Sequence, residues 1–236
     1  MTLWEDYILS SFWDKFYLNF IKEDRYMYLV NGLKNTLLIT LFAVIIGVIL
    51  GFLVAVIRST YAKTGKMKLL DMICGLYLTV VRGTPVMVQL LIMFYVVFVS
   101  SNNKLMVAVI AFGINSGAYV AEIVRSGIMS IDAGQFEAGR SLGFSYPKTM
   151  WYIILPQAFK NILPALANEF IVLLKETSIC GYIGLTDLTR GGDIIRSRTY
   201  EAFLPLLGVA LIYLVMVAGL SALVKVLERR LSASDR

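Results

Sequence analysis

The chain has 236 residues, of which 58% are hydrophobic and only 16% are charged. Soluble domains average about 45–50% apolar and about 25% charged residues, so this composition requires a lipid bilayer as solvent. Lys and Arg exceed Asp and Glu by 22 to 16, an excess expected in cytoplasmic loops of membrane proteins rather than a sign of nucleic-acid binding. The absence of histidine excludes Ser–His hydrolases, His-ligated metal sites and His proton relays on this chain.

Residues 1–29 precede the first apolar run and are rich in aromatic and acidic residues. Amphipathic aromatic rings favour the membrane–water interface. We therefore predict that residues 1–29 form an interfacial amphipathic segment. Its aromatic residues include Trp4, Tyr7, Phe12, Trp13, Phe16, Tyr17 and Phe20.

Five apolar stretches follow, each compatible with the roughly 20 residues that a helix needs to cross a bilayer. The second is interrupted by Arg82-Gly83-Thr84-Pro85. The sequence predicts an all-α membrane protein with about five transmembrane helices, a single transmembrane domain over residues 30–228 and a cytoplasmic tail over residues 229–236. The stretches are Leu37–Ile57, Met72–Val99, Leu105–Val124, a segment within Trp151–Leu174, and Phe203–Val224.

Basic residues predict the orientation of the spans. The segment from Arg58 to Lys68 holds four Lys or Arg residues and no acid, and the C-terminal residues are also basic. Both segments are therefore expected in the cytoplasm. Five crossings then place the N-terminus outside and the connection Arg125–Met150 in the cytoplasm. A hairpin in Met72–Val99 would move the C-terminus to the other side, so one interrupted crossing is favoured.

The connection Arg125–Met150 is expected to contain a short helix at about residues 133–146. Gly143 is a favoured C-terminal stop, and Pro147 follows it. Ala138, Gly139 and Leu142 would give this helix a small, close-packing face. A short rigid helix between two spans is suited to docking in the groove of a partner.

The same segment carries a recognisable motif. Glu137-Ala138-Gly139-x-x-Leu142-Gly143, nine further residues and then Ile-x-Leu-Pro up to Pro156 resemble the EAA loop of ABC-importer permease subunits. Gly139 replaces the usual second alanine. Other motifs are similar to the polar amino-acid permeases of that family, and their order and spacing extend the resemblance over about residues 30–228. They are Gly32-Leu33-x-x-Thr36-Leu37, Arg82-Gly83-Thr84-Pro85 with Gln89, Ser116-Gly117-Ala118-Tyr119, Glu122-x-x-Arg125 and Lys175-x-Thr177-Ser178.

The resemblance implies a type I importer permease that works with other chains. These are two cytoplasmic ABC ATPase subunits, a second permease copy, expected to be identical, and an extracytoplasmic amino-acid-binding protein. The helix around residues 133–146 would be the coupling helix, which transmits ATPase closure to the pore. Its coupling residues would be Glu137, Ala138, Gly139, Leu142 and Gly143.

The chain carries no nucleotide-binding loop of its own. Thr64-Gly65-Lys66-Met67 lacks both the upstream glycine and the final hydroxyl of the phosphate-binding motif. We therefore predict that the chain is not an enzyme, binds no cofactor, and leaves ATP and magnesium to its ATPase partners. An ion-coupled secondary amino-acid transporter is the alternative, but no internal repeat is visible and the docking helix would be unexplained.

Polar residues within the apolar stretches mark a candidate substrate pocket, because such residues usually face a cavity or the bundle interior. Helical spacing places several of them on common faces. Asn, Gln and Tyr side chains suit a zwitterion, and Glu122 and Glu169 suit a cationic side chain such as that of arginine, lysine or histidine. The candidates are Gln89, Met93, Asn115, Ser116, Tyr119, Glu122, Asn168 and Glu169.

Three structural alternatives stay open for these residues. Glu122 can pair with Arg125 at i+3 near the cytoplasmic interface. Asn115 and Ser116 can serve as polar contacts between helices. Arg82 fits a gate as well as it fits a side chain that reaches the cytoplasmic surface.

Overall fold

The computed structural model describes residues 11–233, and all regular secondary structure in this range is helical. After an α-helical segment at residues 11–16, nine α-helices are joined by short π- and 3-10-helical turns. The α-helices are α2 (Tyr26–Thr64), α3 (Lys68–Gly83), α4 (Val86–Ile92), α5 (Lys104–Met129), α6 (Ala133–Ser141), α7 (Tyr146–Thr149), α8 (Leu155–Glu176), α9 (Leu188–Thr199) and α10 (Phe203–Ala233). The turns are η1 (Tyr17–Ile21), η2 (Lys22–Asp24), η3 (Met93–Val97), η4 (Met150–Ile154) and η5 (Thr177–Ile183).

The centre of the bundle is the contact between α2 and α5, which small residues bring close together. A Cβ atom on Gly47 would lie 2.8 Å from the Ser116 hydroxyl, and one on Gly51 would lie 2.5 Å from the Val120 side chain. Glycine at these positions lets the two backbones approach, as is common between helices in membranes. Helix α8 packs on α5 through Gly127, whose position leaves no room for a side chain beside Ile162.

Three helices are long and apolar enough to span a membrane, namely α2, α5 and α10. A fourth candidate is the pair formed by α3 and α4 with η3, which is bent by 110° at the break between its halves. The bend occurs where Thr84 is extended and Pro85 precedes the first turn of α4, so the predicted interruption of Met72–Val99 is a sharp corner. Helix α8 has a sufficient length of 22 residues but is not among the apolar candidates, because it carries Lys160 and Glu169 besides several amides. Length and composition thus support three or four spans.

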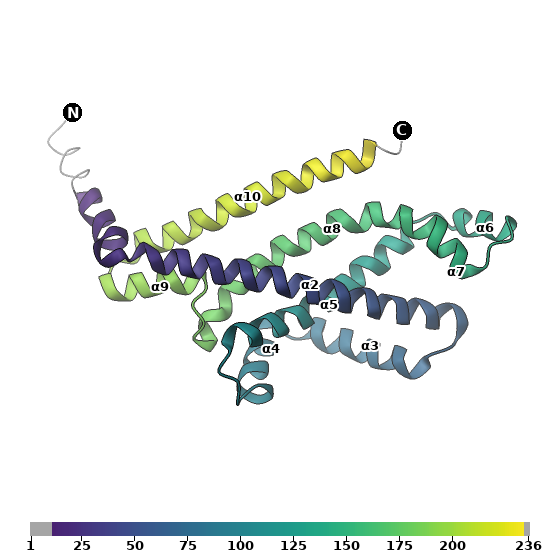
Figure 1. Ribbon diagram of the computed structural model, residues 1–236, viewed down its shortest axis with the longest axis horizontal. Coiled ribbons are helices and arrows are strands. Elements are labelled where there is room, and N and C mark those ends of the chain that lie inside the picture. Colours follow the sequence, from purple (N-terminus) through teal and green to yellow (C-terminus); the bar gives the residue numbers. More distant parts are fainter. Residues whose placement is uncertain (1–10, 234–236) are drawn as a thin grey trace.

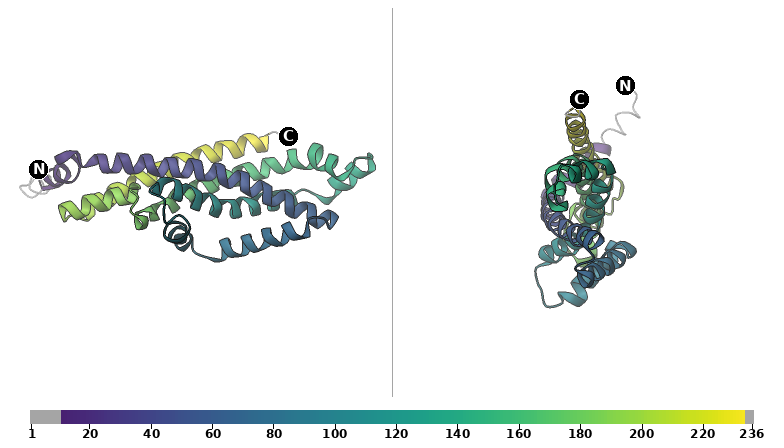
Figure 2. Two further views of the ribbon diagram at one scale, coloured as in Figure 1. Left: turned by 60° about the horizontal axis from the view of Figure 1, so that its bottom comes forward. Right: turned by 90° about the vertical axis from the view of Figure 1, so that its right-hand side faces the viewer.

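The elements gather at two opposite ends of an elongated bundle (Figures 1 and 2). One end, called here the α6 end, holds α6, α7, the end of α2 and the start of α3, and α10 runs toward it. The other, the α9 end, holds η1, the start of α2, η5 and α9. The basic segment after Arg58 and the segment with the EAA-like motif therefore lie at the same end.

The segment before α2 is helical from residue 11, although residues 1–10 of the predicted interfacial segment lie outside the described range. Trp13 and Tyr17 are exposed. The Phe20 ring lies 5.1 Å from the Phe16 ring in a tilted arrangement and packs with the apolar cluster around α9. The other boundary also differs from expectation. Helix α10 continues to Ala233, so the first residues of the predicted tail 229–236 extend this helix.

Candidate functional site

The corner between α3 and α4 is stabilised by the side-chain amide of Gln89. Its Nε2 donates to the carbonyl oxygens of Val81 at 2.8 Å and Thr84 at 3.0 Å and lies 2.9 Å from the Thr84 hydroxyl. Its Oε1 accepts a hydrogen bond of 2.9 Å from Nδ2 of buried Asn115 on α5. Pro85 breaks the helical hydrogen-bond ladder at this point, and Gln89 supplies donors to the carbonyl groups that the break releases. The same residue attaches α4 to α5.

A second polar contact joins α5 to α8. The hydroxyl of Ser116, which is fully buried, donates to Oε1 of Glu169 at 2.9 Å. Because Asn115 and Ser116 are adjacent on α5, one helix turn connects both α4 and α8 to the central helix. This arrangement agrees with the open alternative that these two residues form polar contacts between helices.

A cluster of charges lies farther along α5, toward the α6 end. Glu122 accepts from Nε of Arg125 at 3.1 Å and from its Nη2 in a second, shorter contact. Arg82 on the last turn of α3 brings Nη1 to 3.4 Å from Oε2 of Glu122. The Arg82 guanidinium also lies 5.9 Å from the centroid of the Tyr119 ring. The expected pair of Glu122 and Arg125 is therefore present, together with a second cation that sequence spacing did not reveal.

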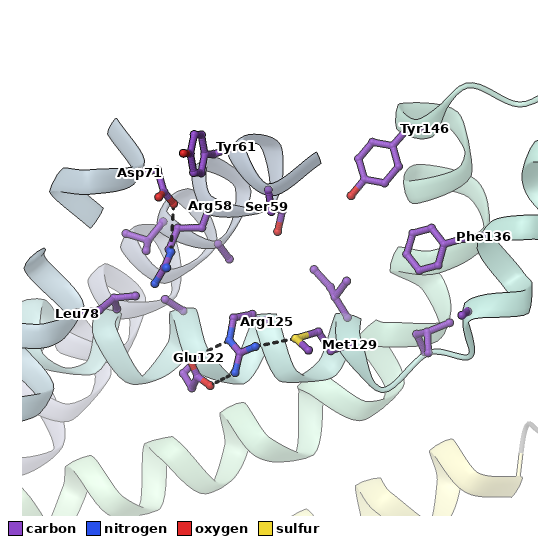
Figure 3. A pocket seen from close by; sticks show the side chains of 17 residues that line it. Arg58, Ser59, Tyr61, Asp71, Leu78, Glu122, Arg125, Met129, Phe136 and Tyr146 are labelled. Atoms are coloured by element: carbon purple, nitrogen blue, oxygen red, sulfur yellow. Dashed lines mark hydrogen bonds and ion pairs between the residues drawn. The ribbon is translucent and has the colours of Figure 1, made fainter. Parts of the chain in front are cut away.

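An open groove of about 620 Å³ adjoins this cluster at the α6 end (Figure 3). Arg58 and Asp71 form an ion pair of 3.3 Å on one side, and Glu122 and Arg125 lie on another side. The groove extends to Phe136 of α6. It thus connects a predicted substrate residue to the predicted coupling helix. The lining residues are Val54, Ala55, Arg58, Ser59, Tyr61, Ala62, Asp71, Leu78, Ala121, Glu122, Arg125, Ile128, Met129, Ile131, Ala133, Phe136 and Tyr146.

The eight predicted substrate residues do not form one pocket. Only Glu122 among the eight lines the groove. Six of the eight take part in the contacts along α5 described above, namely Gln89, Asn115, Ser116, Tyr119, Glu122 and Glu169. Met93 packs with the apolar cluster around Leu90 and Phe112. Asn168 is exposed on α8. The charged pair Arg58 and Asp71 was not singled out from the sequence, although Asp71 is the first acidic residue after a strongly basic segment.

Helix α6 is shorter than the predicted range 133–146. Asp132 caps its start by accepting from the amide of Gly134 at 2.7 Å, and the helix ends at Ser141. Gly143 then adopts the left-handed conformation at φ +79°, which glycine tolerates best. The amide of Phe144 closes the end by donating to the Gly139 carbonyl at 3.0 Å. Pro147 lies in the first turn of α7 and so begins a new helix.

The predicted coupling residues lie in α6 and in the two residues after it, and they differ in exposure. Glu137, Ala138, Leu142 and Gly143 are exposed, and Leu142 exposes 72% of its surface. Gly139 is buried, and a Cβ atom there would lie 2.5 Å from Cγ2 of Thr149. Gly139 therefore serves the packing of α6 on the following segment. This contact also explains why glycine occupies a position where the motif usually has alanine.

The α9 end contains a different polar arrangement. Asp187 is fully buried and caps α9, with Oδ2 accepting from the Thr189 amide at 2.9 Å. Its Oδ1 has no hydrogen-bond partner among the described residues, and burial raises the pKa of this carboxyl to about 6. Thr36 of α2 accepts from the Leu188 amide at 3.1 Å. Gly32, one turn earlier, packs directly against the Asp187 backbone. The segment from Gly32 to Thr36 is therefore the part of α2 that contacts the start of α9.

Comparison with known proteins identifies the architecture. Residues 44–233 match the family model described as binding-protein-dependent transport system inner membrane component. The chain belongs to this family. Members of the family are permease components of ABC transporters, so the chain is a multi-pass inner-membrane subunit that works in a complex with ATPase subunits.

Individual relatives of this permease agree with the family match. The arginine transport system permease protein ArtQ of Bacillus subtilis (strain 168) is 39% identical over 211 residues, which are 88% of this chain and 94% of ArtQ. The glutamine transport system permease protein GlnP of Escherichia coli (strain K12) is 35% identical over 207 residues, or 86% and 92% of the two chains. A crystal structure of an amino acid ABC transporter with histidines has a TM-score of 0.82 at 44% identity, covering 89% of this chain and 98% of that one.

Membership of this permease family decides two questions that the sequence raised. The permease has no catalytic role and no cofactor of its own, because ATP is bound by the ATPase partner. The prediction of an ABC permease is confirmed, and the alternative of an ion-coupled secondary transporter is thereby excluded. Within residues 11–233, His, Cys, Asp and Glu side chains form no group suited to hold a metal ion.

Proposed function

We propose that this permease forms the membrane path for a polar or basic amino acid and that Glu122 contacts the cationic part of the cargo. The observation that carries the proposal is the position of Glu122. Its carboxylate pairs with Arg82 and Arg125, and Arg82 also lies beside the Tyr119 ring. Glu122 lines a groove that reaches α6. A carboxylate that attracts two guanidinium groups has the chemistry needed to bind the side chain of arginine or lysine.

The cargo class is supported by the relatives and by the polar contacts along α5. The similar proteins are named for arginine and glutamine transport, and the similar crystal structure contains histidines. Gln89, Asn115 and Ser116 provide amide and hydroxyl groups that suit a zwitterion. Glu169 adds a second carboxylate close to them, bound to Ser116. Arginine, lysine or histidine is therefore the proposed cargo, with glutamine as the neutral competitor.

The proposed topology has five crossings, an extracytoplasmic N-terminus and a cytoplasmic C-terminus. Helix α8 is then the fourth of the five spans, and its polar residues are accommodated by α5 and by the cargo path. This orientation is supported by the basic segment after Arg58, which shares the α6 end with the coupling helix. Residues 1–29 would lie along the outer membrane surface, and residues 30–228 would form the permease domain.

The proposed assembly is a homodimer of this chain with two ATPase subunits below it and an amino-acid-binding protein above it. Each copy holds its own α6 and its own groove, so two identical copies provide two docking sites. The exposed residues Glu137, Ala138 and Leu142 would contact an ATPase subunit. Gly139 and Gly143 would act indirectly, because they fix how α6 packs and where it ends.

Uptake measurements test the proposed role of the two carboxylates. The permease, its ATPase subunits and its binding protein are reconstituted in proteoliposomes, and ATP-driven uptake of arginine, lysine, histidine and glutamine is measured. Glu122→Gln and Glu169→Gln should each reduce the preference for cationic cargo over glutamine, by about 10-fold or more for Glu122→Gln. Asp193→Asn is the matched control, because Asp193 also pairs with two arginines but lies on α9. An unchanged preference in both glutamate variants would refute the proposal.

A further inference from the structure

Arg82 is the only charged residue in the apolar stretch from Met72 to Val99. It lies in the last turn of α3, directly before the 110° corner with α4. A charge in such a segment is costly and usually has a function or a specific partner. The sequence leaves two roles open for Arg82, a gate or a side chain that reaches the membrane surface, and the contacts of its guanidinium distinguish between them.

The guanidinium of Arg82 occupies a site with two components. Nη1 lies 3.4 Å from Oε2 of Glu122, and the guanidinium carbon lies 5.9 Å from the centroid of the Tyr119 ring. A carboxylate beside an aromatic ring is an arrangement that binds organic cations. Tyr119 and Glu122 are three residues apart on α5, so one face of this helix forms the site. Arg82 thus directs its charge at α5, which favours the gate over a side chain that merely reaches water.

Arg82 is the weaker of the two cations bound to Glu122. Arg125 forms two contacts with the carboxylate from the same helix, whereas Arg82 forms one longer contact from another helix. The Arg82 side chain also retains 42% of its exposure. Its departure would therefore leave Glu122 paired with Arg125 and would add little buried charge.

The backbone around Arg82 is held independently of its side chain. Gln89 binds the carbonyl oxygens of Val81 and Thr84, which flank Arg82 and Gly83, and Asn115 fixes Gln89 to α5. These contacts keep the corner in place when the guanidinium moves. Release of Arg82 from Glu122 thus requires a change of rotamer and no movement of α3.

We propose that Arg82 is a tethered substitute for the cationic side chain of the cargo. In the empty permease its guanidinium occupies the Tyr119–Glu122 site and obstructs it, and an arriving cation displaces it. Displacement reduces the apparent affinity for cationic cargo by the fraction of time that Arg82 occupies the site. The inference rests on the proposed function, because it requires that Glu122 contacts the cargo.

Equilibrium binding of lysine tests this role directly. The permease–ATPase complex in nanodiscs, without binding protein, is titrated with labelled lysine and labelled glutamine. Arg82→Gln should bind lysine about 3- to 10-fold more tightly than wild type, and glutamine within about 2-fold, because only the internal cation has been removed. Arg82→Lys keeps the charge and should stay near wild type. Arg196→Gln is the matched control, since Arg196 is a half-exposed, paired arginine on α9.

A second variant allows the charge to be restored on the same folded protein. Arg82→Cys should also bind lysine more tightly, and modification with a methanethiosulfonate reagent that adds an ethylammonium group should reverse this gain. A reagent that adds a neutral methyl group should leave the gain in place. The native cysteines Cys74 and Cys180 are buried, and unmodified wild type treated with both reagents controls for them.

The possible outcomes separate this inference from the proposed function. If the wild-type complex binds neither lysine nor glutamine, the proposed function is wrong. If the wild type binds lysine but Arg82→Gln and Arg82→Cys leave its affinity unchanged or weaken it, Arg82 is no competitor and only this inference is overturned. Failure of both variants to assemble with the ATPase would also overturn it, because Arg82 would then be required for the fold.

Discussion

The two ends of the bundle hold their carboxylates in different ways. At the α6 end, Asp71 and Glu122 are partly exposed and paired with arginines around an open groove. At the α9 end, Asp187 is fully buried and contacts mainly backbone amides. Exposed ion pairs contribute little stability and exchange partners easily, whereas buried polar groups are sensitive to each neighbour. The α6 end is thus suited to rearrangement and the α9 end to fixed packing.

The largest effect is expected where α9 contacts α2. In Gly32→Val, the new Cβ would overlap the Asp187 backbone, and the helices cannot separate without losing the hydrogen bond from the Leu188 amide to the Thr36 hydroxyl. The expected loss is about 3 kcal/mol or more of stability, visible as a lower melting temperature and a low yield of monodisperse protein in detergent.

A glycine in an open position provides the control for this substitution. Gly75 in α3 has no neighbouring atom within 4 Å of a built Cβ. Gly75→Ala should therefore be neutral or stabilising by up to about 1 kcal/mol through helix propensity. If Gly32→Val melted at the same temperature as Gly75→Ala, the close contact at the α9 end would be incorrect.

The second largest effect concerns the charge of Asp187. Its folded-state pKa of about 6 lies above the ordinary value of 3.8, so the folded protein binds more protons than the unfolded chain between these pH values. The contribution of Asp187 to stability should therefore be most favourable below pH 4, decrease as pH rises to about 6, and stay constant above that value. The decrease corresponds to roughly 3 kcal/mol. Asp187→Asn keeps a capping oxygen without the charge and should melt at a higher temperature than wild type at pH 7.5.

Melting curves at several pH values check this prediction. The difference between Asp187→Asn and wild type should appear between pH 4 and pH 6 and level off above. Asp193→Asn provides the opposite case, because hydrogen bonds from Arg196 hold the pKa of that carboxyl below its usual range. A stability difference for Asp187→Asn that did not depend on pH would contradict the burial of a charged carboxylate.

A smaller effect is expected for α6 at the other end. Gly139→Ala places a methyl group against Thr149 and should cost about 1 to 2 kcal/mol, unless α6 shifts outward. Because α6 is a surface element, the variant should stay folded. The stimulation of ATPase activity by cargo should nevertheless decrease clearly. Ser141→Gly, at an exposed position of α6 outside the proposed docking residues, controls for helix propensity, which costs up to about 1 kcal/mol. Equal coupling in both variants would contradict the packing role of Gly139.

The smallest effect is expected for the ion pair of Arg58 and Asp71. Asp71→Asn should change stability by about 1 kcal/mol or less, and the change should diminish further in 1 M salt because exposed charges are screened. Melting temperatures at low and high salt measure this effect. A loss as large as that in Gly32→Val would show that the two ends are equally rigid.

The sequence predicted the elements whose signals are local. The long uncharged run in α2, the interruption at Pro85 and the glycine that ends α6 depend on neighbouring residues only. The order of the polar motifs likewise identified the family, because each motif occupies its own position in the bundle. The pair Glu122 and Arg125 followed from helical spacing alone.

The remaining contacts depend on tertiary geometry. The partner of Arg82 was hidden because it requires the 110° corner that brings the end of α3 to α5. Gly139 was assigned to a docking face because nothing in its own helix reveals Thr149 beneath it. Asn161 and Asn168 are seven residues apart on one side of α8 and both are exposed, yet only Asn161 reaches another helix, through the Ser130 hydroxyl. Helical periodicity shows which residues share a face of a helix, but it does not show which other elements that face contacts.

The length of α2 relates this bundle to the thickness of a bilayer. Its 39 residues extend about 58 Å at 1.5 Å per residue, nearly twice the roughly 30 Å of hydrocarbon in a membrane. The uncharged run from Leu37 to Ile57 alone matches that hydrocarbon thickness. If this run fills the hydrocarbon, the turns around Thr36 and Arg58 lie at opposite headgroup layers. The buried Asp187 network and the open groove would then lie at the levels of the two headgroup layers. Bilayers of different thickness would consequently act on both ends of this permease at once.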